Sequence, residues 1–308
     1  DLMAAFTAFS PVYIALAALL TVIFLVVRGM ASRTLLENKV TFRQAFLTIN
    51  VGYLLNNIFP LRAGELGRAV LLGQSSGLGP MHVLSTIVIE RAFDLAIAAG
   101  MLLSTLPLAL GMTWARPVAV LTLLLVIAML AALFMMARYQ SKVHDWAGWL
   151  GRRIPLVERL VIPQLDALLR GLSVLVKPRM FLLSFGWIAL SWVVAVAEYY
   201  VMIYALNPRA PLWWGAFVDS VLALGIAVPS APGALGVFEA AMVGALSLLG
   251  FSASIGLAYA VILHFTQWVI TAIFGIYGLM REGRSLSSFV SDITARVLTR
   301  SAPNETLK

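Results

Sequence analysis

The segment Asn57-Ile-Phe-Pro60-Leu-Arg62-Ala-Gly64-Glu65-Leu-Gly-Arg68 interrupts a long apolar stretch with two arginines, a glutamate, a proline and two glycines. A charged side chain at the centre of a bilayer costs about 2.5–3.5 kcal/mol on insertion scales. Irregular backbone at that depth is tolerated only where protein or water surrounds it. We therefore expect this segment to lie inside a bundle of membrane helices, against a polar cavity, and we place the functional site there.

Composition supports a membrane protein around this segment. Of the 308 residues, 61% are hydrophobic and 12% are charged, whereas a soluble domain has about 45–50% apolar and about 25% charged residues. The chain has no cysteine, which excludes disulfides, thiolate metal sites and a cysteine nucleophile.

The positive charge is distributed unevenly along the chain. Of the 22 Lys and Arg residues, four lie in 28–43, eight in 138–179 and five in 281–308, whereas only Arg116 and Arg209 fall in the loops predicted on the other side. The positive-inside rule assigns the three basic stretches, and the C-terminus, to the cytoplasm. The net charge of +8 thus indicates topology and a preference for anionic lipid, and we expect no nucleic-acid partner.

Five apolar segments approach the ~20 residues that a spanning helix needs. They are residues 11–28, 83–106, 117–137, 180–206 and 255–280.

Two further apolar stretches, 42–79 and 213–250, are interrupted near their middles, at 60–64 and 228–236. Interrupted segments in corresponding halves of a chain are typical of transporters built from inverted repeats. We predict an all-α polytopic membrane protein with about five spanning helices and two oppositely oriented re-entrant helical hairpins.

The remaining polar segments suggest a simple domain organisation. Residues 138–179 place apolar side chains at helical spacing and predict a cytoplasmic amphipathic insert, with Trp146 and Trp149 as surface anchors. We expect a single transmembrane domain over 1–282 and a cytoplasmic tail over 283–308.

The first interruption has the composition of an anion site. Gly64 permits a tight turn, Glu65 can pair with Arg68 three residues on, and a half-helix start presents unpaired N–H groups and a positive dipole end. With Arg62 alongside, we predict phosphate binding. The alternative is a cap whose charges satisfy one another near the interface, where arginines can extend to the headgroups.

Glu90, Arg91 and Asp94 follow in the segment 83–106. Unpaired, they would cost on the order of 8–10 kcal/mol, so we expect them to face the bundle interior and to pair with Arg62 or Arg68. Two interpretations stay open: a direct role in ligand binding or proton transfer, and a salt-bridge network that fixes helix packing.

The second interruption offers Pro232, Gly233, Gly236 and Glu239, which we interpret as the opposing gate. Prolines at a helix start lose no hydrogen bond and glycines allow close backbone approach; the alternative is a structural break that only shapes a hairpin.

Isolated polar residues in the apolar helices form a last group. Glu198, Asp219 and His264 are candidate proton carriers, although each could instead be a hydrogen-bonded structural residue. No nucleotide-binding loop, serine-hydrolase elbow or zinc-binding motif occurs, and we expect no metal and no cofactor.

Three motifs together resemble a known family. Asn56-Asn57-Ile-Phe-Pro60-Leu-Arg62-Ala-Gly64-Glu65, Ile89-Glu90-Arg91-Ala-Phe-Asp94 and Pro232-Gly233-Ala-Leu-Gly236-Val-Phe-Glu239 are similar to the lysylphosphatidylglycerol synthase transmembrane, flippase-like (UPF0104) family. The resemblance implies paired re-entrant hairpins and movement of lipids between leaflets. Because no aminoacyl-transferase sequence follows residue 282, we expect a stand-alone member.

The function we expect is translocation of an anionic phospholipid, a hopanoid-type lipid or a lipid-linked headgroup across a bacterial inner membrane. Two alternatives stay open: a membrane-embedded transferase acting on a polyprenyl-phosphate or phospholipid, and a lipid-binding scaffold without transport. Membrane lipids are the expected partners, with a homo-oligomer and a lipid-biosynthesis enzyme as further candidates.

Overall fold

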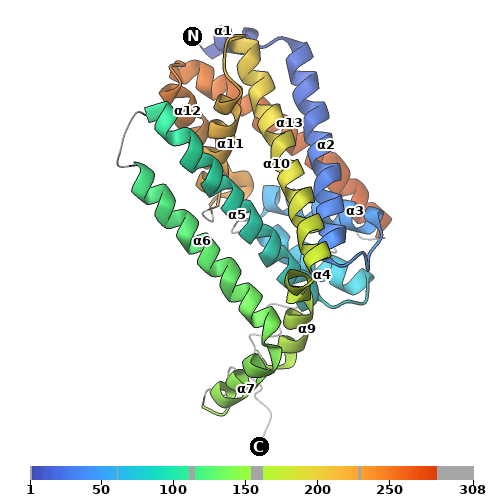
Figure 1. Cartoon of the computed structure of the whole chain (residues 1–308). Helices are drawn as coiled ribbons and strands as arrows, with labels where there is room; N and C mark the ends of the chain where they lie inside the picture. Colours follow the sequence, from blue (N-terminus) through green and yellow to red (C-terminus); the bar gives the residue numbers. More distant parts are fainter. Residues whose placement is uncertain (1, 61, 111–114, 154–161, 228–229, 283–308) are drawn as a thin grey trace, which may run out of the picture.

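A computed structural model describes residues 2–60, 62–110, 115–153, 162–227 and 230–282. All secondary structure in these ranges is helical (Figure 1). The elements are α1 (Leu2–Thr7), α2 (Pro11–Leu35), α3 (Phe42–Ile58), α4 (Ala63–Ser75), α5 (Pro80–Leu110), α6 (Ala115–Arg138), α7 (Gln140–Gly151), α9 (Ile162–Leu172), η1 (Ser173–Val176), α10 (Pro178–Leu206), α11 (Trp213–Gly225), η2 (Pro232–Ala234), α12 (Val237–Leu248) and α13 (Ala253–Arg281).

Four of these helices are long and apolar enough to cross a bilayer. They are α2, α5, α10 and α13, and each contains one of the predicted spans. The fifth predicted span, 117–137, forms α6, and its crossing of the membrane stays a prediction. The predicted fold class, an all-α polytopic membrane protein, is confirmed.

Both interrupted stretches fold as helical hairpins that break where the sequence predicts. The first, α3 and α4, begins with a capping box in which Thr41 and Gln44 bond each other's backbone N–H. It breaks before Arg62, whose backbone is left-handed (φ 55°, ψ 37°). The second, α11 and α12, turns through Gly236 (φ 82°), a conformation that glycine adopts at little cost. That the hairpins enter the membrane from opposite sides stays a prediction.

The two halves of the chain pack in equivalent ways. In the first, α2 contacts α3, α3 contacts α4, and α4 contacts α5; in the second, α10, α11, α12 and α13 repeat this order of contacts. The halves also exchange contacts reciprocally, because α5 packs on α11 and α13 packs on α3. Helices α2 and α10 lie side by side and run in opposite directions (Figure 1). This order of contacts is the one that the predicted inverted repeat requires.

The insert between the halves lies at the end of the molecule opposite α1 (Figure 1). Its helix α9 buries Leu165, Leu169 and Leu172 in a cluster with Ile89 and Phe93 of α5. The predicted apolar face of this helix is therefore covered by protein and not by lipid, while Trp146 and Trp149 of α7 are exposed. The rest of the predicted amphipathic pattern, 157–161, and the tail 283–308 lie outside the described residues.

Candidate functional site

A cavity of about 570 Å³ lies between the two halves and is lined by helices from both. Pockets for small ligands span roughly 300–1,000 Å³. Phe59 and Arg62 line it from the break of the first hairpin, and Ala231 and Gly233 from that of the second. An ideal Cβ on Gly233 would lie 3.7 Å from Asn57 Cα. The two interruptions, far apart in sequence, thus meet at one cavity.

A buried cluster of ion pairs forms one wall of this cavity. Glu90 accepts hydrogen bonds from Arg28 Nη2 at 2.6 Å and from Arg68 Nη2 at 2.9 Å. Asp94 accepts from Arg28 at 2.8 Å through each of its oxygens, and Trp192 Nε1 donates to Asp94 Oδ1 at 3.0 Å. Bidentate Arg–carboxylate pairs are among the strongest hydrogen-bonded ion pairs.

Arg28 is a central member that the sequence reasoning assigned wrongly. The sequence places it in the basic stretch 28–43 that is predicted to be cytoplasmic, at the end of an apolar run. Helix α2 instead continues to Leu35, which places Arg28 inside the bundle with 2% of its side chain exposed. One feature of the sequence predicts its place: the segment 83–106 carries two acidic residues and one arginine, so it needs a further cation from another helix.

Arg68 is likewise locked in place. The sequence predicts pairing of Glu65 with Arg68, but Arg68 donates to Ser32 Oγ at 2.7 Å and to Glu90. Glu65 instead pairs with Arg62 at 3.5 Å and with Arg91 at 3.6 Å. The expected pairing of Glu90 with Arg68 is present. Arg62 does not join this pair and bonds the backbone of the second hairpin.

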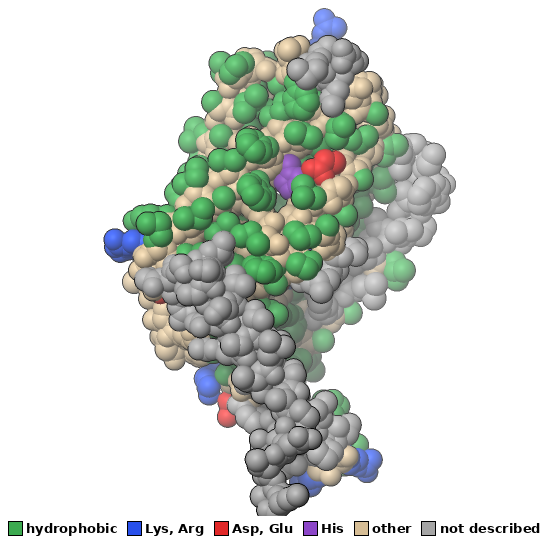
Figure 2. Space-filling view, turned by 180° about the vertical axis from the view of Figure 1, so that it is seen from behind, with side chains coloured by type: hydrophobic (Ala, Val, Ile, Leu, Met, Phe, Trp, Pro, Cys, Tyr) green, Lys and Arg blue, Asp and Glu red, His purple; other side chains and the backbone are tan. Residues whose placement is uncertain are grey.

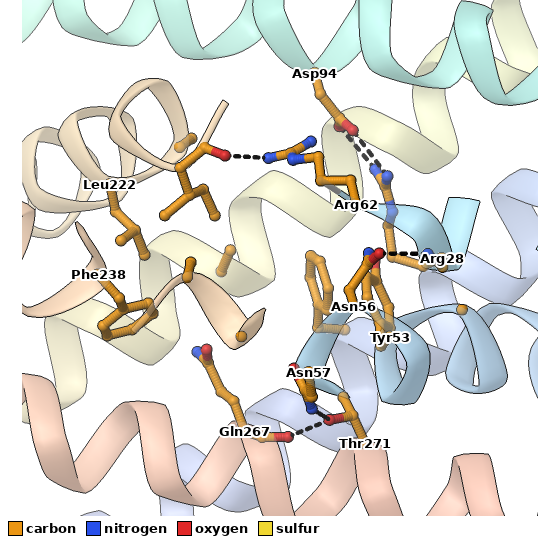
Figure 3. A pocket seen from close by; sticks show the side chains of 18 of the residues that line it. Arg28, Tyr53, Asn56, Asn57, Arg62, Asp94, Leu222, Phe238, Gln267 and Thr271 are labelled. Atoms are coloured by element: carbon orange, nitrogen blue, oxygen red, sulfur yellow. Dashed lines mark hydrogen bonds and ion pairs between the residues drawn. The ribbon is translucent and has the colours of Figure 1, made fainter. Parts of the chain in front are cut away.

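Arg62 and Arg91 are the arginines that remain accessible from the cavity. Their side chains are 29% and 30% exposed, and both line it. Arg62 Nη2 donates to the Ile226 carbonyl oxygen at 2.5 Å, and Figure 3 shows the guanidinium reaching toward the second hairpin. Arg91 also contacts Glu90 and Asp94, at 3.2 and 3.3 Å.

The charges of this cluster do not cancel. Its four arginines, Arg28, Arg62, Arg68 and Arg91, face three carboxylates, Glu65, Glu90 and Asp94, which leaves one positive charge. An anion at the accessible arginines would balance it.

The start of α4 differs from the prediction. The sequence predicts unpaired N–H groups there, but Gly64 N donates to Asn56 Oδ1 at 2.8 Å, Ala63 N to Pro60 O at 3.4 Å and Glu65 N to Arg62 O at 3.1 Å. The N–H groups of the first three residues of α4 are thus already paired. Anion binding at this hairpin therefore falls to side chains.

The second hairpin contributes only part of the predicted gate to the cavity. Gly233 lines it, with Ala231 and Ala234. Glu239 instead caps its own helix, accepting from Gly236 N at 2.6 Å. Its other oxygen lies 2.7 Å from His264 Nδ1. Pro232, Gly236 and Glu239 are not among the residues that line the cavity.

His264 lines the cavity, whereas its partner Glu239 does not. Its ring stacks on Phe238, with centroids 4.1 Å apart. A histidine beside an acidic side chain is visible on an otherwise hydrophobic face of the molecule (Figure 2).

Glu198 and Asp219 line the same cavity away from the arginines. Glu198 Oε1 accepts from Thr21 Oγ1 at 2.9 Å and from Gln267 Nε2 at 2.8 Å.

Several cavity residues escaped the sequence reasoning because they are neutral. Tyr53, Asn56, Asn57 and Trp192 line it, and Asn57 Nδ2 donates to Thr271 Oγ1 at 3.1 Å (Figure 3). The paired asparagines before the first break were the only visible signal. In the part of the chain that the structure describes, no group of three or more His, Cys, Asp or Glu residues could hold a metal ion.

Fold and cavity define a polytopic membrane protein whose two halves pack in equivalent ways around a charged central site. Residues 1–275 match the model of the lysylphosphatidylglycerol synthase TM region. The chain belongs to this family, which confirms the resemblance seen in its motifs. It is 26% identical over 310 residues to a UPF0104 membrane protein of Methanothermobacter thermautotrophicus, covering 92% of this chain and 88% of the relative. No solved structure matches the chain significantly.

Proposed function

We propose that the protein moves a lipid with an anionic, phosphate-bearing headgroup between the leaflets of the membrane. The observation that carries this proposal is the meeting of both hairpin breaks at one cavity, beside a cluster in which four arginines face three carboxylates. Substrate sites of inverted-repeat transporters lie at the interface between the repeats, close to the bilayer midplane.

Arg62 and Arg91 hold the headgroup in this proposal. Guanidinium groups match the oxygens of a phosphate in a bidentate way, and these two are the partly exposed arginines of the cluster. Arg28, Arg68 and Glu90 are buried and keep Arg91 and Asp94 in position. Glu65, which contacts both accessible arginines, competes with the phosphate for them and favours its release.

The hairpin breaks act as the gate. Arg62 bridges from one break to Ile226 beside the other, so a phosphate that takes over this guanidinium also releases the contact between the hairpins. The acyl chains stay in the bilayer while the headgroup crosses the polar cavity. The distribution of Lys and Arg supports a cytoplasmic C-terminus in this proposal.

The test is leaflet exchange in liposomes that contain the purified full chain and headgroup-labelled fluorescent lipids, read with a membrane-impermeant quencher. We expect exchange of an anionic lipid, lost in Arg62→Ala and Arg91→Ala. Arg43→Ala is the matched control, because Arg43 is exposed outside the cluster. Absence of exchange for every lipid class, or equal exchange in the two cavity variants and the parent, would refute the proposal. Conversion of the labelled lipid to a new species would favour a transferase.

A further inference from the structure

Glu198 and Asp219 form an acidic site in the wall of the cavity. Their residues are only 3% and 5% exposed, yet both line the cavity and lie close enough to interact electrostatically. Asp219 Oδ2 is buried and has no hydrogen-bond partner among the described residues. Such an oxygen lacks the partner that buried polar atoms normally have.

The contrast with the arginine cluster is informative. Each carboxylate of that cluster contacts at least one arginine. Within the described ranges, neither Glu198 nor Asp219 has a Lys, Arg or His nitrogen within 4.0 Å. Burying an ionised carboxylate without a counter-charge costs several kcal/mol. A cation that binds here removes this cost.

We propose that Glu198 and Asp219 bind a monovalent cation, a proton or a sodium ion, whose binding is coupled to movement of the headgroup. This inference rests on the proposed function for its coupling, but not for the cation site itself. The carboxylate oxygens of Glu198 and Asp219 are the ligands for a hard cation, and the Thr21 hydroxyl oxygen lies 2.9 Å from Glu198 Oε1. Gln267 Nε2 donates to Glu198 Oε1 and to the Tyr199 hydroxyl, at 2.8 and 3.2 Å, and so holds the Glu198 carboxylate in position. Oxygen ligands of this kind select protons and small hard cations.

The position of the site favours coupling. Thr21 belongs to α2 of the first half, whereas Glu198, Asp219 and Gln267 belong to α10, α11 and α13 of the second. Coupling ions in inverted-repeat transporters bind at this kind of interface. Helix α11 carries Asp219 and ends at Gly225, next to the Ile226 carbonyl that Arg62 bonds. A shift of α11 on cation binding would therefore move the Arg62 contact.

Electrostatics provides a second link to the headgroup site. Asp219 interacts with Asp94 as well as with Glu198, and Asp94 holds Arg28 and Arg91. A cation at Asp219 cancels a negative charge near Asp94 and therefore makes the electrostatic potential at the headgroup site more positive, which favours an anionic headgroup there. The other titratable groups that line the cavity near the pair or interact with it are Tyr199, Tyr259 and His264.

Infrared difference spectroscopy of the purified full chain in lipid nanodiscs tests the site without any lipid transport. The carboxyl bands are recorded for a pH step above the range in which exposed carboxyl groups titrate, at constant sodium, and for a sodium step at constant pH. We expect a carboxyl signal in one of these steps, and this step identifies the cation. Glu198→Gln and Asp219→Asn should each remove a part of the signal, whereas the exposed Asp145→Asn should leave it unchanged. No carboxyl signal in either step, or an undiminished signal in both cavity variants, would overturn the proposal.

A flux measurement separates this inference from the proposed function. In liposomes with an imposed pH or sodium gradient, net movement of the labelled lipid should follow the gradient of the coupling ion, and Asp219→Asn should abolish this dependence. If the infrared signal is present but no lipid moves, the cation site stands and the transport function falls. Lipid movement that ignores both gradients would refute the coupling and leave the transport function intact.

Discussion

Arg62 Nη2 lies 2.5 Å from the carbonyl oxygen of Ile226, so a side chain at the break of the first hairpin is bonded to the backbone beside the break of the second. Arg62 itself adopts a left-handed backbone conformation. In a non-glycine residue such a conformation costs on the order of 1–3 kcal/mol and persists where the surroundings enforce it, commonly at functional sites. The backbone strain at Arg62 and its bond to Ile226 together indicate that this bond between the hairpins can open.

Cross-linking can test this contact, because the chain has no native cysteine. An ideal Cβ at position 233 lies 3.5 Å from the Asn57 carbonyl oxygen, so Asn57→Cys with Gly233→Cys should form a disulfide under mild oxidation. Adding Arg62→Ala should slow its formation severalfold, since the hairpins then lose their bond. Gel mobility after oxidation measures this.

The two single cysteine variants are the controls. Each shows how much intermolecular disulfide forms, and Gly233→Cys alone shows whether a side chain is tolerated at this position, where φ is +62°. Equal cross-linking rates with and without Arg62 would show that this side chain does not hold the hairpins together.

Removing the charge of Glu90 should destabilise the bundle. Glu90→Gln leaves Arg28 and Arg68 buried with less compensation, and breaking a buried ion pair in this way costs about 3–5 kcal/mol. Thermal unfolding in detergent should show a lower Tm than the parent, while the exposed Asp145→Asn should not. A Glu90→Gln variant as stable as the parent would mean that the cluster does not support the fold.

The sequence predicts the helices and their breaks well because both depend on local features. Apolar length sets α2, α5, α10 and α13, and Pro60, Gly64 and Gly236 set the breaks. The capping of α3 by Thr41 and Gln44 is equally local.

Contacts between the halves depend on helix rotation and length, which local patterns fix poorly. Arg28 joins Glu90 only because α2 runs one to two turns past the apolar segment. The sequence predicts Glu239 in the gate, but its carboxylate bonds the start of its own helix and His264. That both breaks line one cavity could not be derived from either hairpin alone.

Close packing in the first hairpin gives a third prediction. A Cβ on Gly64 would overlap the Gly52 carbonyl oxygen and lie 2.6 Å from Asn56 Oδ1. Gly64→Ala should therefore force α3 and α4 apart and lower the Tm. Gly100→Ala is the matched control: a Cβ at position 100 meets nothing within 4 Å, and an alanine in a helix is favoured by about 0.5–1 kcal/mol over glycine. If both variants unfold at the same temperature, the close approach at Gly64 is not required.

The last prediction concerns pH and the loop before α3. Glu37 accepts from Ser173 Oγ and from Lys177 Nζ, both at 2.7 Å, and so ties this loop to the insert. Partial burial acts to raise the pKa of Glu37, but the hydrogen bonds from Lys177 and Ser173 and the charge of Lys39 outweigh it and lower the pKa below its ordinary value of 4.5.

A carboxylate whose pKa is lowered by folding stabilises the protein above its unfolded pKa, and this contribution is lost as the pH falls through the folded value. Glu37→Gln should thus lower stability at pH near 7 by about 1 kcal/mol, given the exposure of Lys177. The difference in Tm between variant and parent should shrink as the pH is lowered below 4.5. If the difference in Tm stays constant over this range, the ionised form of Glu37 makes no contribution to stability. Asp145→Asn is the control, and its difference in Tm from the parent should not depend on pH.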